Sequence, residues 1–150
     1  MDYEYLIRDL NQVSSRKIIG TDKGLAKIGD GVINLAFSVA KSIFLTNNSI
    51  NKKIVRTGLK VNRTILSNAL KNANMKEFAK SRGDAHDLAD TVEAIMAYVW
   101  LSNKMTLSDI IDLLKNNFEG DFHIKSQELK FAIQAFTKLL IHVIKYLPEK

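Results

Sequence analysis

Apolar residues recur at intervals of three and four along most of the chain, the spacing that places them on one face of an α-helix. The longest series predicts a helix from Lys23 to about Thr46, with Thr21 or Asp22 as its N-cap. After residue 31 this helix is apolar around most of its circumference, so we expect it to be central in the core or shared with a second subunit. Further helices are predicted over residues 3–10, 61–73, 75–81, 85–101 and 125–147, and from Thr106 to about residue 118.

The segments between these helices are predicted to be loops and turns. Residues 11–17 are polar, residues 50–60 are basic and poorly periodic, and residues 82–84 form the turn sequence Arg-Gly-Asp. The chain has seven glycines and one proline, too few turn formers for a β-sandwich or β-barrel of 150 residues. We therefore predict a single all-α domain over residues 1–150.

The composition excludes several classes of protein. The chain has 46% hydrophobic and 25% charged residues, which is typical of a globular protein and not of a disordered one. It has no cysteine, which excludes disulfides, Cys-ligated zinc, iron–sulfur clusters and thiolate catalysis. Asp2 and Glu4 stand where a signal peptide is basic and apolar, and the apolar stretch 31–40 is too short to span a bilayer. We expect a soluble, cytoplasmic protein without a membrane segment.

Positive charge is concentrated in one part of the chain. No acidic residue lies between Asp30 and Glu77. The basic residues of that segment are Lys41, Lys52, Lys53, Arg56, Lys60, Arg63, Lys71 and Lys76. Such a segment, in a chain of formal net charge +6, favours a partner that is a polyanion; the alternative is a solvated basic face that serves solubility.

Acidic residues recur every third position near the start of the predicted helix 85–101, at Asp84, Asp87, Asp90 and Glu93. Residues three apart are neighbours on a helix surface, so Asp90 and Glu93 can reach one cation together. Hard oxygen ligands of this kind suit Mg²⁺ or Mn²⁺. The alternative is that these acids form an ordinary solvated helix face.

A further acid, Asp30, stands between two glycines inside the long predicted helix. Each glycine costs about 1 kcal/mol relative to alanine in a helix interior, so something should require the missing side chains. Close approach of another helix is the expected reason. If that helix carries Asp90 and Glu93, three carboxylates converge.

Two motifs in the chain resemble those of the ribonuclease III family. Residues 25–35, Leu-Ala-Lys-Ile-Gly-Asp-Gly-Val-Ile-Asn-Leu, resemble its signature helix, and residues 88–95, Leu-Ala-Asp-Thr-Val-Glu-Ala-Ile, resemble its second motif. Residues 62–70 are similar to the stretch that precedes the second motif. The resemblance implies a helical homodimer that cuts double-stranded RNA with Mg²⁺, for which Mn²⁺ can substitute. It assigns metal binding and catalysis to Asp30, Asp90 and Glu93.

The chain departs from the family at two positions of the first motif. Ala26 stands where the family usually has a metal-binding glutamate, and Lys23 replaces a second glutamate. The chain is similar in this respect to the short form called mini-ribonuclease III, which also lacks a double-stranded-RNA-binding domain. A non-catalytic RNA-binding or ribosome-associated protein on the same fold is therefore the second hypothesis. For either function, the residues expected to contact RNA phosphates are Lys52, Lys53, Arg56, Lys60 and Arg63.

Overall fold

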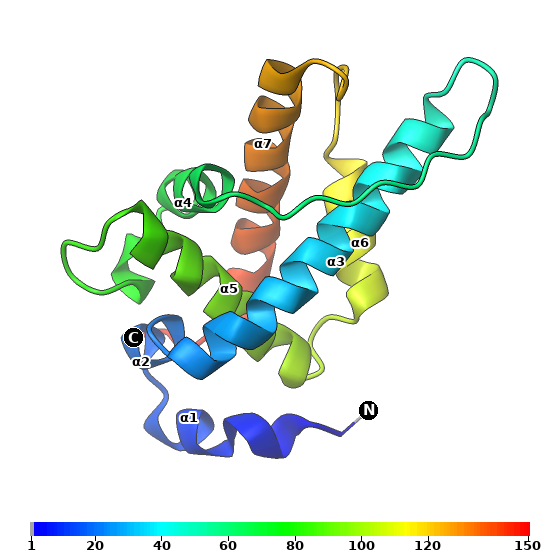
Figure 1. The fold of residues 1–150 in the computed structure, drawn as a ribbon. Helices are drawn as coiled ribbons and strands as arrows, with labels where there is room; N and C mark the ends of the chain where they lie inside the picture. The colour runs from blue at the N-terminus through cyan, green and yellow to red at the C-terminus, as the bar shows by residue number, and fades with distance from the viewer. Residues whose placement is uncertain (1) are drawn as a thin grey trace.

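Two long helices, α3 (Lys23–Asn47) and α5 (Ala85–Leu101), cross at the centre of the structure (Figure 1). The computed structural model describes residues 2–150, and in these residues all regular structure is helical. The other elements are η1 (Glu4–Ile7), α1 (Arg8–Val13), α2 (Arg16–Gly20), α4 (Arg63–Asn72), η2 (Lys76–Phe78), α6 (Leu107–Asn116), α7 (Lys125–Val143) and η3 (Ile144–Tyr146). The predicted all-α class is therefore confirmed.

The crossing of α3 and α5 is a contact between backbones. A Cβ atom placed on Gly29 would lie 1.7 Å from the carbonyl oxygen of Glu93, which no side chain can tolerate. A Cβ on Gly31 would meet nothing within 4 Å. Of the two glycines, only Gly29 makes the expected close approach to another helix within residues 2–150.

The core lies on both sides of this crossing. Almost the whole of α5 is buried, and α3 packs against it and against α6. Phe37 of α3 stacks on Phe136 of α7 with ring centroids 6.0 Å apart, and it meets Phe118 edge to face at 5.6 Å. By length and composition α3 would also suit a membrane-spanning helix. In the described residues α3 packs against α5 and α6, and 33% of its most apolar window is buried.

Side-chain caps explain where the helices that carry the candidate site begin. Asp22 accepts a hydrogen bond from the N–H of Leu25 at 2.8 Å at the start of α3, and Asn62 accepts one from Ile65 at 2.9 Å at the start of α4. These caps satisfy N–H groups that have no partner inside the helix. Cap residues visible in the sequence therefore fix the register of both helices.

The predicted helix 125–147 ends as an α-helix at Val143, and the predicted helix 3–10 is the turn η1 followed by α1. Two other predicted segments differ more. Part of the predicted loop 11–17 is helical, because Ser14 adopts a left-handed φ of 54° that ends α1 and the Ser15 side chain then caps α2. The predicted helix 75–81 shrinks to the single turn η2, since Ala79 is extended. The helix 85–101 has the predicted bounds.

Replacing Gly29 by alanine should destabilise the protein, because the added methyl group forces α3 and α5 apart. Overpacking of this kind costs about 1–3 kcal/mol, which corresponds to a fall in Tm of roughly 2–4 °C per kcal/mol for a chain of this size. Gly31→Ala is the matched control and should leave the Tm unchanged or raise it. Thermal unfolding followed by circular dichroism gives the Tm of both variants. An equal fall in Tm for Gly29→Ala and Gly31→Ala would contradict the backbone contact.

Candidate active site

A cavity of about 670 Å³ opens where α3, α5 and the start of α4 meet. Asp30 of α3 and Asp90 and Glu93 of α5 all line it. The three carboxylates come together because Gly29 and Glu93 are in contact at the helix crossing, and Asp30 follows Gly29 directly. The convergence expected from the sequence is therefore present.

Asp30 is held in place by its own helix. Asn34, one turn later on α3, donates a hydrogen bond from Nδ2 to Asp30 Oδ1 at 3.1 Å. The Oδ1 atom of Asn34 accepts a hydrogen bond from the backbone N–H of Val61 at 2.8 Å. Both ends of the Asn34 amide are thus engaged, which fixes the amide orientation and with it the carboxylate.

Glu93 lies half-buried beside the other two carboxylates. Burial raises its pKa from 4.5 to about 8, and a hydrogen bond to Asp30 and the negative charges of Asp30 and Asp90 act in the same direction. The positive charge of Lys60 acts in the opposite direction but is the weaker influence. Glu93 therefore holds a proton at neutral pH unless a cation joins the site.

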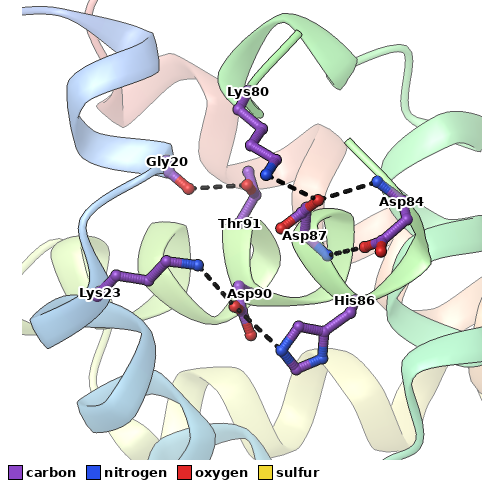
Figure 2. Close-up of polar contacts among 8 residues, drawn as sticks. All are labelled: Gly20, Lys23, Lys80, Asp84, His86, Asp87, Asp90 and Thr91. Atoms are coloured by element: carbon purple, nitrogen blue, oxygen red, sulfur yellow. Dashed lines mark hydrogen bonds and ion pairs between the residues drawn. The ribbon is translucent and has the colours of Figure 1, made fainter. Parts of the chain in front are cut away.

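Asp90 has basic neighbours of its own (Figure 2). Lys23 Nζ lies 3.2 Å from Asp90 Oδ2, and His86 Nε2 lies 3.7 Å from the same oxygen. The Lys23 side chain is 71% exposed, so this ion pair is weak and can open at little cost. Ala26 also lines the cavity, and its methyl group leaves space where a longer side chain would reach the carboxylates.

The two earlier acids of the series, Asp84 and Asp87, have a different task (Figure 2). Each accepts a hydrogen bond from the backbone N–H of the other, at 2.9 and 3.0 Å, which is the reciprocal cap at the start of α5. The hydrogen bond from the Asp84 N–H also lowers the pKa of Asp87. Only Asp90 and Glu93 of the four acids face the cavity.

The predicted RNA-contacting residues divide into two groups. Lys60 and Arg63 line the cavity, whereas Lys52, Lys53 and Arg56 are exposed and lie outside its lining. The sequence reasoning missed Lys27, which also lines the cavity. Its position three residues before Asp30 on the same helix was the available signal, because such residues share a helix face.

A family model described as Ribonuclease III matches residues 23–149. The chain belongs to the ribonuclease III family. No curated protein matches it closely enough to add to this assignment. The match spans both motifs and continues through α6 and α7, so the resemblance seen in two motifs extends over most of the chain. Membership of the ribonuclease III family supports a ribonuclease-type enzyme that acts on RNA.

Within residues 2–150 of this ribonuclease III family protein, no three His, Cys, Asp or Glu side chains are arranged as a ready metal-binding group. The donor chemistry nevertheless fits a divalent cation. Three carboxylates line one cavity, and burial together with the hydrogen bond and charges of its acidic neighbours holds a proton on Glu93 that a cation would displace. Asp30, Asp90 and Glu93 are the residues that would hold it.

The contribution of Glu93 to the free energy of unfolding should decrease as the pH rises from about 4.5 to about 8. The folded state retains a proton there that the unfolded chain has released, so unfolding is favoured as the pH rises through this range. Glu93→Gln keeps the shape of the side chain without titrating. Its Tm should exceed that of the wild type by more above pH 8 than at pH 4.5, in metal-free buffer.

Glu119→Gln, at an exposed position after α6, is the control for this comparison. It should follow the wild-type Tm at every pH. A Tm difference for Glu93→Gln that stays constant across the pH range would contradict the raised pKa.

Proposed function

We propose that this protein is a Mg²⁺-dependent endoribonuclease that hydrolyses phosphodiester bonds of double-stranded or structured RNA and works as a homodimer. The observation that carries the proposal is the convergence of Asp30, Asp90 and Glu93 in a cavity whose other wall holds Lys60 and Arg63. Converging acids beside bases suit a phosphate group and a cation together. Membership of the ribonuclease III family supports the same chemistry.

The carboxylates and the basic residues of the site have separate roles in this proposal. Asp30, Asp90 and Glu93 hold Mg²⁺, or Mn²⁺ in its place, and Asn34 orients Asp30. A cation held there would supply a lowered pKa for the attacking water and positive charge beside the phosphate. The basic residues bind the phosphates on either side of the scissile bond; they are Lys27, Lys60 and Arg63.

A second function, RNA binding without cleavage, is favoured by one observation. Lys23 pairs with Asp90 at 3.2 Å, and Ala26 supplies no ligand, so part of the negative charge of the site is already neutralised. A site balanced in this way has less need of a cation. A cleavage assay on an RNA duplex distinguishes the two functions.

Cleavage of an end-labelled RNA duplex should require Mg²⁺ or Mn²⁺ and should stop in EDTA. Glu93→Gln should lower the cleavage rate by at least about a hundredfold, because removing one group that stabilises the transition state commonly costs that much. Its affinity for the duplex in Mg²⁺ should be unchanged or higher, since the basic residues of the cavity are retained and the lost carboxylate is one that is charged only when a cation is bound. Gel analysis of the products and fluorescence anisotropy measure the two quantities.

The matched control is again Glu119→Gln, which should cut at the wild-type rate. Binding without cleavage by the wild-type protein, in Mg²⁺ and in Mn²⁺ alike, would favour the non-catalytic function. Equal loss of binding and cleavage in Glu93→Gln would indicate that the site is wrongly assigned.

The proposed homodimer is supported by an apolar stripe on the outer face of α3. Ile28 is 39% exposed and Leu35 is 52% exposed, and Gly31 between them has open space above it. The three positions lie on one side of the helix. A second copy packed along this stripe would bury these side chains and place the two cavities close to the interface.

Leu35→Lys should convert a dimer into a folded monomer, because a charge replaces the most exposed apolar side chain of the stripe. Ile141→Lys is a matched control, since Ile141 of α7 is also 52% exposed. Light scattering after size exclusion gives the mass, and circular dichroism checks the fold. A wild-type monomer at micromolar concentration, or the same mass for both variants, would rule out this interface.

A further inference from the structure

An extended segment, residues 54–61, crosses α3 on its way back to α4 and is called the strap below (Figure 1). Four α3 side chains spaced by one helical turn hold it by accepting hydrogen bonds from its alternate N–H groups. The pairs are Thr46 with Val55 at 2.9 Å, Ser42 with Thr57 at 3.0 Å, Ser38 with Leu59 at 3.1 Å and Asn34 with Val61 at 2.8 Å.

The regular pairing has a geometric cause. Four residues of α-helix rise about 6.0 Å, and two residues of extended chain rise about 6.6 Å, so one helical turn matches every second strap residue. A hydroxyl both accepts and donates. Thr46 therefore also donates to the carbonyl of Val55 at 3.2 Å. The single hydroxyl hydrogen of Ser42 has two acceptors within reach, the carbonyl of Ser38 at 2.8 Å and that of Thr57 at 3.0 Å.

This arrangement leaves the opposite edge of the strap free. In an extended chain the N–H and C=O groups of one residue point to the same side, and those of the next residue point to the opposite side. The N–H groups of Arg56, Gly58 and Lys60 consequently point away from α3, and they make no hydrogen bond within residues 2–150. All three residues are exposed.

Charge decides which partner fits this edge. A free strand edge normally invites another strand, and lysine or arginine along it discourages that pairing. Arg56 and Lys60 lie on the strap, Lys52 and Lys53 precede it, and no acidic residue occurs between Asp30 and Glu77. Lys60 and Val61 also line the carboxylate cavity, so the edge leads directly to the candidate active site.

RNA offers both groups that such an edge requires. Phosphate oxygens accept hydrogen bonds from backbone N–H groups and pair with arginine and lysine. The 2′-hydroxyl can donate to the outward-facing carbonyl groups, which DNA cannot do. We propose that the free edge of the strap, at Arg56, Gly58 and Lys60, docks the sugar–phosphate backbone of RNA and leads it to the carboxylate cavity. This inference rests on the proposed RNA substrate and assigns the surface that holds it.

Amide hydrogen exchange measured by NMR tests the proposal residue by residue. In the free protein the N–H groups that α3 holds, those of Val55, Thr57 and Leu59, should exchange slowly. The outward-facing N–H groups of Arg56, Gly58 and Lys60 should exchange rapidly. An RNA duplex added in EDTA should slow the outward-facing amides at least about tenfold. A DNA duplex of the same sequence should protect them less.

Three outcomes would overturn the proposal. One is unchanged exchange at Arg56, Gly58 and Lys60 while the RNA binds. Another is equal protection by DNA, which would leave the carbonyl groups without a role. The third is protection in the free protein that grows with concentration, which would mean that the strap of a second copy occupies the edge.

Gly58→Pro removes one outward N–H group without touching any hydrogen bond to α3, and Gly58→Ala retains that group. The proline variant should bind the RNA duplex about tenfold more weakly, and the alanine variant like the wild type. Slow exchange at Thr57 and Leu59 shows that the strap is intact in each variant. Equal affinities of both variants would overturn the proposal. Metal-dependent cleavage by the wild type would still stand in that case, whereas absence of any RNA binding would overturn the proposed function itself.

Discussion

Contact between Gly29 and the backbone of Glu93 is the constraint on which the site depends. Packed helices ordinarily lie about 8–10 Å apart because side chains separate them. Here the Glu93 carbonyl oxygen occupies the place of the missing Cβ, so α3 and α5 approach more closely at one point. The residue after Gly29 is Asp30, and Asp90 lies one turn before Glu93, so all three acids meet at the crossing. The gathering of negative charge follows from the absence of one methyl group.

Bringing three carboxylates together has an electrostatic cost, and each carboxylate is compensated differently. Asp90 has an exposed lysine, Lys23, as a partner, and Asp30 has the amide of Asn34. The pKa of Glu93 is raised, first by burial and then by Asp30 and Asp90, and the opposing influence of Lys60 is too weak to offset them. A divalent cation at this position would remove the proton and the repulsion together. Family membership and the local energetics therefore lead to the same expectation about a metal.

Much of the fold and the whole acidic site could be predicted from the sequence, because helix periodicity and the spacing of acids by three are local signals. The convergence of Asp30 with Glu93 was also predictable, since a glycine in a helix interior requires a reason. The open position of Gly31 was not, because nothing in the local pattern separates it from Gly29, and a Cβ there would meet no atom of residues 2–150 within 4 Å. The strap was missed for another reason. Ser38 and Ser42 look like scattered polar positions in an apolar helix, and their partners are backbone groups of a distant segment that has no pattern of its own.

Asn34 is the residue where the site and the strap meet. Its amide donates to Asp30 and accepts from Val61, so neither hydrogen bond can lengthen without moving the other partner. The serine and threonine pairings lie progressively farther from the cavity, and Thr46 is the most distant. Loosening of the strap from its outer end can therefore proceed through several pairings before Asp30 is disturbed. The side chain that orients Asp30 is therefore also the last of the four α3 side chains that hold the strap before α4 begins.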